Sequence, residues 1–137
     1  MNRTFIRGAP GLAQPPSPIS QAVVAGNQCW VSGQLSVSEA GVFLPGTVAE
    51  EARRAFGNVF AALAAAGFGI ADIVFLDIAF IDLADVAQVN EVMAGVFPAD
   101  RSPARTIYQA AALPYGGRVK VQAVAVRDVS AIGEGFW

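Results

Sequence analysis

Three absences limit what this chain can do. The sequence of 137 residues has no histidine, so it lacks the side chain that enzymes use most often as a general base. Its single cysteine, Cys29, excludes an internal disulfide and fits a reducing compartment. One thiol also cannot build a thiolate cluster, and we therefore expect no bound metal.

Charge is scarce as well. Only 15% of the residues are charged, the net charge is −2, and the cations are scattered instead of forming a basic stripe. A nucleic-acid partner is therefore not expected. The N-terminus has no apolar core like that of a secretory signal, and the most apolar stretch, Val59 to Ile81, is interrupted by glycines and aspartates. We expect a cytoplasmic protein without a membrane partner.

Apolar side chains, in contrast, make up 54% of the chain. Its length fits one domain, residues 1–137, with no repeat and no dividing linker. A small domain has much surface relative to its core, so this composition leaves apolar surface for other copies of the chain to cover. The aromatic C-terminal segment Gly133–Trp137 would either dock on such a neighbour or fray.

Runs of β-branched and aromatic residues between turn signals predict six strands, and the first is expected to pair with the second. They cover Thr4–Arg7, Gln28–Val37, Gly41–Gly46, Asp72–Ile81, Thr106–Ala110 and Arg118–Arg127. Apolar residues at three- and four-residue steps predict a helix over Val48–Ala66, with Thr47 and Glu50 at capping-box spacing. A second helix begins at Asp82, and its inner face contains Val86, Val89, Met93, Val96 and Phe97. This order gives an α+β fold with both helices on one face of a sheet.

The other face of the sheet is predicted to be apolar too. It would carry Val74, Leu76, Ile78 and Phe80 from one strand and Val124 and Val126 from the last. Burial of each such side chain stabilises by roughly 1.5–3 kcal/mol. We therefore expect subunits to pack sheet against sheet.

Two cations lie close together in the sequence. On the last strand Val119, Val121, Ala123 and Ala125 point one way, so Lys120 and Gln122 point toward the expected interface. Arg105 has a planar fork that suits a carboxylate. Two interpretations remain open for each cation. Arg105 either holds a ligand or pairs with a fixed acid across the interface. Lys120 either acts in a site, or it forms an ion pair or extends its ammonium to the solvent as a surface residue.

Three ordered motifs resemble the RidA-like family, also called the YjgF or L-PSP endoribonuclease family. They are "ISQAVVAGNQCWVSGQL" at Ile19–Leu35, the long segment Ala49–Phe97, and "SPARTIYQAAALP" at Ser102–Pro114. The resemblance extends from Pro18 to Arg127. It implies a chorismate-mutase-like fold with a mixed sheet, assembled as a homotrimer with clefts between neighbouring subunits.

The resemblance also implies a function. Active members of the family hydrolyse 2-imino and enamine acids to 2-keto acids and ammonia without a metal or organic cofactor. Arg105 would bind the substrate carboxylate, and the backbone at Ile107 would contact the imine nitrogen. Ser32 and Gly33 would line the cleft, with Asn90 nearby. Tyr115, in the predicted turn, would border it.

The chain departs from the family pattern inside the expected cleft. Ile19 replaces a tyrosine, Ile107 replaces a frequent cysteine, and Lys120 and Gln122 replace two glutamates of the last strand. The first glutamate is the residue thought to place the attacking water. Lys120 would act as a base or nucleophile only as a neutral amine, and with Arg105 it makes the cleft more cationic. The alternative function is a non-catalytic trimeric binder of small carboxylates. The acidic net charge disfavours ribonuclease activity.

Overall fold

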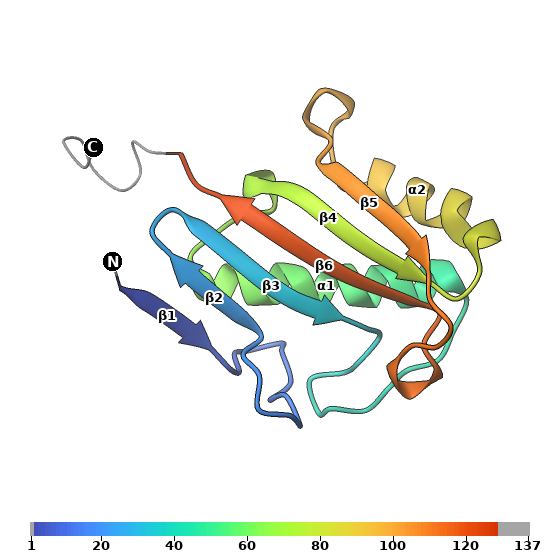
Figure 1. The fold of residues 1–137 in the computed structure, drawn as a ribbon, viewed down its shortest axis with the longest axis horizontal. Coiled ribbons are helices and arrows are strands. Elements are labelled where there is room, and N and C mark those ends of the chain that lie inside the picture. The colour runs from blue at the N-terminus through green and yellow to red at the C-terminus, as the bar shows by residue number, and fades with distance from the viewer. Residues whose placement is uncertain (1, 129–137) are drawn as a thin grey trace.

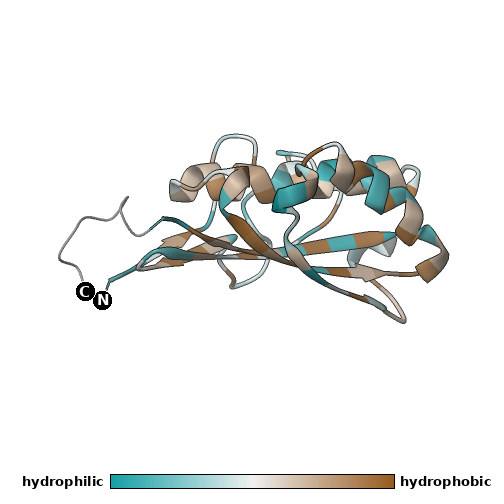
Figure 2. Ribbon diagram, turned by 90° about the horizontal axis from the view of Figure 1, so that it is seen from above, coloured by the Kyte–Doolittle hydropathy of each residue, from teal (hydrophilic) through white to brown (hydrophobic). Residues whose placement is uncertain are grey.

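The computed structural model describes residues 2–128, so the expectation for Gly133–Trp137 lies outside the described residues. Six strands form one sheet, and two helices cover one of its faces (Figures 1 and 2). The strands are β1 (Arg3–Ile6), β2 (Ala22–Ala25), β3 (Gln28–Gln34), β4 (Ile73–Phe80), β5 (Ala104–Gln109) and β6 (Val119–Val126), and the helices are α1 (Val48–Ala66) and α2 (Val86–Ala94). The predicted α+β fold is confirmed. None of the helices within residues 2–128 is long and apolar enough to cross a membrane.

The first helix is formed as its sequence predicts. Thr47 and Glu50 make a reciprocal capping box, in which each side chain accepts a hydrogen bond from the other residue's backbone N–H. Gly67 ends α1 in the left-handed region, with φ 84°. The second helix is shorter than expected. Asp82 caps a single 3-10 turn before α2, and Val96 and Phe97 lie beyond the helix end.

The strand order β1-β2-β3-β6-β4-β5 corrects two predictions. β1 pairs with β2 and not with β3, because Gly26 and Asn27 form a two-residue turn that folds β2 back on β3 as a hairpin. The expected strand Gly41–Gly46 is reduced to one isolated bridge between Val37 and Phe43. All neighbours are antiparallel except β4 and β5, which makes the sheet mixed.

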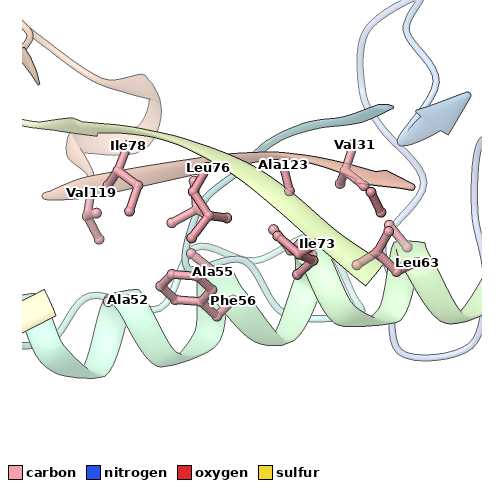
Figure 3. Close-up of a cluster of buried hydrophobic side chains, with 14 of the residues drawn as sticks. Val31, Ala52, Ala55, Phe56, Leu63, Ile73, Leu76, Ile78, Val119 and Ala123 are labelled. Atoms are coloured by element: carbon pink, nitrogen blue, oxygen red, sulfur yellow. The ribbon is translucent and has the colours of Figure 1, made fainter. Parts of the chain in front are cut away.

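The core lies between the sheet and α1. β6 alternates as predicted, and Val119, Val121, Ala123 and Ala125 are all buried on the helix side. The expectation for β4 was wrong. Leu76, Ile78 and Phe80 are fully buried in the core instead of lying on the open face. Figure 3 shows Leu76 and Ile78 pointing toward α1. An irregularity in the pairing with β6 between Ile73 and Phe75 shifts the alternation, so that Ile73 and Leu76 share the inner face.

The open face of the sheet nevertheless carries an apolar row. Paired positions on five adjacent strands place apolar residues side by side, and they are Phe5, Val23, Trp30, Val124 and Phe75. We call these five residues the open-face row. Phe5 is 64% exposed and Trp30 is 44% exposed. The expectation of an apolar open face therefore holds. Val124 and Val126 of β6 lie on it as predicted, whereas Leu76, Ile78 and Phe80 do not.

A buried carboxylate joins α1 to the start of β6. Glu51 accepts a hydrogen bond from the backbone N–H of Arg118 at 2.9 Å and another from the backbone N–H of Gly46 at 3.3 Å. The Arg118 guanidinium lies 3.7 Å from the same carboxylate. These contacts satisfy a charge that would otherwise be costly to bury. They also fix where β6 enters the sheet.

We expect Glu51→Ala to lower the free energy of unfolding by about 3 kcal/mol, because two partly buried N–H groups lose their acceptor and the Arg118 guanidinium loses its partner. Urea denaturation followed by circular dichroism measures this change. Glu91→Ala, at an exposed position of α2, is the matched control and should change stability by less than about 0.5 kcal/mol. A loss below about 1 kcal/mol in Glu51→Ala would show that the carboxylate is not a structural anchor.

Candidate functional site

Arg105 is held in place by α2. It lies on β5, the edge strand next to β4, on the face that the helices cover. Its Nη1 donates a hydrogen bond of 2.6 Å to the side-chain oxygen of Asn90 and lies 3.4 Å from the sulfur of Met93. Both partners are neutral. The guanidinium is therefore positioned without being neutralised.

The rest of the Arg105 fork is free for a ligand. Within residues 2–128, no carboxylate forms a salt bridge with it, and its Nε and Nη2 atoms donate no hydrogen bond. Arg105 is partly buried, and its two partners, Asn90 and Met93, line a hollow of about 320 Å³ together with Ser102. Ile107 follows two positions later on the same side of β5 and is 36% exposed.

A larger pocket, of about 470 Å³, opens at the end of β3. Its wall includes four residues that the sequence singled out, namely Ile19, Gly33, Tyr115 and Lys120. The segment Leu12–Ser17, which no sequence motif had marked, closes another side of it. The volume lies within the range of small-molecule sites.

Lys120 lies directly over Gly33. A Cβ atom at Gly33 would overlap the Lys120 Cε, so the glycine makes the room that this side chain occupies. The pairing of β3 with β6 is irregular between Val31 and Gln34, which places Gly33 in a bulge. Ser32, in the same bulge, donates its hydroxyl to the Ser20 carbonyl at 2.6 Å.

Two glutamines that the sequence analysis had not singled out hold this bulge. Gln34 donates to the side-chain oxygen of Gln21 at 2.8 Å, and Gln21 donates to the carbonyl of Ala13 at 2.8 Å. Both side chains are buried. A buried amide side chain needs hydrogen-bond partners. The occurrence of two glutamines beside apolar strands was therefore the sequence feature that could have predicted this network.

Tyr115 has an unusual backbone. Its φ of 64° lies in the left-handed region, which costs a residue with a side chain of the order of 1 kcal/mol. Its ring stacks on Phe43 with centroids 5.8 Å apart. The strained turn thus presents the ring at the border of the larger pocket, where it is 52% exposed.

Arg105 and Lys120 do not meet within one copy of the chain. Arg105 pairs in register with Leu76, whose side chain is buried under the helices, whereas Lys120 pairs with Ala79 on the opposite face. Closeness in the sequence therefore does not bring the two cations together within one copy, and their expected meeting in a cleft between subunits stays a prediction. The surroundings of Arg105 and of Lys120 are therefore two separate candidate half-sites in one copy.

The profile of the family described as Endoribonuclease L-PSP matches residues 12–127. The chain belongs to this L-PSP (RidA-like) family. It is 42% identical over 111 residues to the 2-iminobutanoate/2-iminopropanoate deaminase of Bos taurus, a match that covers 80% of each chain. The family resemblance stated from the sequence motifs is therefore confirmed.

Solved structures of L-PSP family members have the same fold. The YjgF gene product of E. coli is 32% identical, with a TM-score of 0.82 over 91% of this chain and 100% of that one. E. coli TdcF, solved with bound serine, shows the same identity, TM-score and coverage. The mixed sheet and the two helices on one face are thus features of the family.

The thiol of the single cysteine is not activated as a nucleophile. Cys29 is fully buried on β3, and burial raises its pKa to about 11, although the nearby Arg127 acts in the opposite direction. At neutral pH the group is therefore a protonated thiol, which is a poor nucleophile.

We expect Cys29 of the native protein to react at least about a hundredfold more slowly at pH 8 with a thiol-specific disulfide reagent than the same chain in denaturant, because it is both protonated and buried. The release of the coloured thiolate measures the rate. Val42→Cys, at an exposed position, supplies the positive control. Rapid reaction of native Cys29 would contradict the placement of this strand in the core.

Proposed function

We propose that this chain hydrolyses 2-imino acids and their enamine tautomers to 2-oxo acids and ammonia, in a cleft formed between copies of the chain. The observation that carries the proposal is the Arg105 fork, which α2 positions and leaves without an anionic partner among the described residues. Similarity to the bovine imine deaminase supplies the reaction class. The bound serine of TdcF is an amino acid, and its carboxylate is the group that such a fork suits.

The reaction needs little from the protein beyond positioning. A water oxygen forms a bond to the imine carbon, the nitrogen takes up protons, and the carbon–nitrogen bond breaks to release ammonia and leave the 2-oxo acid. The imine carbon is already electrophilic, so fixing the carboxylate on Arg105 supplies much of the acceleration. β5 is an edge strand, and its backbone near Ile107 can contact the imine nitrogen.

A complete cleft requires two copies. The half-sites at Arg105 and Lys120 lie on opposite faces of one sheet, so a single chain cannot bring both to one small ligand. The open-face row gives an apolar surface through which copies would associate. We propose a homotrimer in which Arg105 and Asn90 of one copy face Lys120, Gly33, Ile19 and Tyr115 of its neighbour.

A non-catalytic binder is the second candidate function. It is favoured by one observation, which is that an ammonium, Lys120, stands where the family pattern has the water-placing glutamate. The same cleft would then hold a small carboxylate without turning it over. Saturable binding of 2-oxo acids, with no acceleration of imine hydrolysis, distinguishes this function from the first.

We expect Arg105→Gln to lower kcat/KM for imine hydrolysis about a hundredfold, because the charged bidentate contact to the carboxylate is lost. The assay generates imines from amino acids with an amino-acid oxidase and follows keto-acid release above the spontaneous rate. Arg101→Gln, which removes an exposed charge nearby, is the control and should retain wild-type activity. The proposal is wrong if the wild type adds nothing to the rate in buffer for any amino acid tested.

We expect the wild type to form trimers in solution and Trp30→Glu to weaken them at least tenfold, because a charge would enter the centre of the open-face row. Light scattering coupled to gel filtration measures the mass over a range of concentrations. Val42→Glu places the same charge on an exposed apolar residue of a loop and should leave the mass unchanged. A monomeric wild type at tens of micromolar would rule out the shared cleft.

A further inference from the structure

The larger pocket is neutral apart from one charge. Lys120 is its single ionisable lining residue other than Tyr115, and the remaining wall is apolar or carries amides and the hydroxyl of Ser17. The amide of Asn58, for example, is already engaged with the carbonyls of Leu35 and Val37. Among the lining residues, an anionic group entering this pocket would therefore meet one cation and no anion.

The ammonium of Lys120 has no partner in its own chain as far as residues 2–128 show. It makes no salt bridge and no hydrogen bond with any of them. The nearest carboxylate by register is Asp77, on the same face, which pairs with Gln122 while Lys120 pairs with Ala79. The two side chains are diagonal neighbours on adjacent strands and lie beyond the distance of an ion pair.

The position of this charge is built into the strand geometry. Lys120 is partly buried, and its stem passes over Gly33 in the bulge of β3, where any side chain would displace it. A lysine that merely snorkelled to solvent would not need this gap. A charge kept partly out of water without a counter-ion favours a ligand that supplies one.

We propose that Lys120 binds a second anionic group of the ligand, so that the preferred substrates are dicarboxylic 2-imino acids. This inference rests on the proposed function, in which Arg105 of a neighbouring copy holds the carboxylate next to the imine. The pocket beyond Gly33 receives the far end of the substrate, and its volume of about 470 Å³ exceeds the needs of a three-carbon acid.

The test compares two imines that differ in one charge. Oxidases convert glutamate and glutamine to 2-imino acids of nearly equal size, one with a distal carboxylate and one with a distal amide. We expect wild type to favour the glutamate-derived imine in kcat/KM. In Lys120→Met the ratio of the two values should fall about tenfold, or about 1.4 kcal/mol, because the methionine keeps the stem and removes the charge.

Three further variants test whether the ratio depends on the position of the charge. Lys120→Arg should keep the preference within about threefold, since the cation remains. Gly33→Ala keeps the lysine but displaces its stem, and should lower the ratio in the same direction as Lys120→Met. Arg53→Met removes an exposed charge of α1 that is not part of the pocket lining, and should leave the ratio at the wild-type value. An equal ratio in wild type and Lys120→Met overturns the inference.

Failure of the proposed function gives a different result. If neither imine is turned over by wild type, the deaminase proposal falls, and calorimetry with glutarate and its monoamide tests the inference alone. Tighter binding of glutarate by wild type, lost in Lys120→Met, supports the second anion site without catalysis. Equal affinities for the two ligands, or a preference that persists in Lys120→Met, overturn it.

Discussion

The alternation of β6 against α1 is the constraint on which the rest of the molecule depends. β6 lies between β3 and β4, and every second side chain is buried under the helix. A slip of one residue would bring Lys120 and Gln122 into the core, which would be very costly. Glu51 fixes the start of the strand through the backbone of Arg118. The position of Lys120 on the open face thus follows from packing on the other face.

Arg105 and Lys120, the cations of the two candidate half-sites, are positioned by different kinds of contact. Arg105 is placed by a helix, because Asn90 and Met93 of α2 hold one nitrogen of its fork and leave the others free. Lys120 is placed by a strand irregularity, because the bulge at Gly33 makes room for its stem. The neutral side chain of Asn90 fixes Arg105 without reducing its charge. The missing Cβ atom of Gly33 makes room for Lys120 and likewise leaves its charge intact. Both therefore keep their full capacity to bind an anion.

Membership in the L-PSP family bears on the fold and the reaction class, whereas the departures from the family pattern bear on the choice of ligand. The fold, the Arg105 motif and the glutamine-stabilised bulge are compatible with the imine deaminases that the chain resembles. Lys120 reverses the sign of the charge expected at its position, in a pocket without any other full charge. Coulomb interactions are strong where water is partly excluded, and this is the physical basis of the proposed preference for a second anionic group.

Local sequence determined much of this protein. The bounds of α1, its caps, the alternation of β6 and the family motifs could all be read directly, since each depends on residues close together in the chain. The tertiary structure alone decided which face of β4 is buried, because a shift in pairing between Ile73 and Phe75 reverses the pattern that simple alternation predicts. It also decided that Arg105 and Lys120 point to opposite faces. They are near in sequence, but β4 lies between their strands, and the side on which each residue emerges is set by register with that strand.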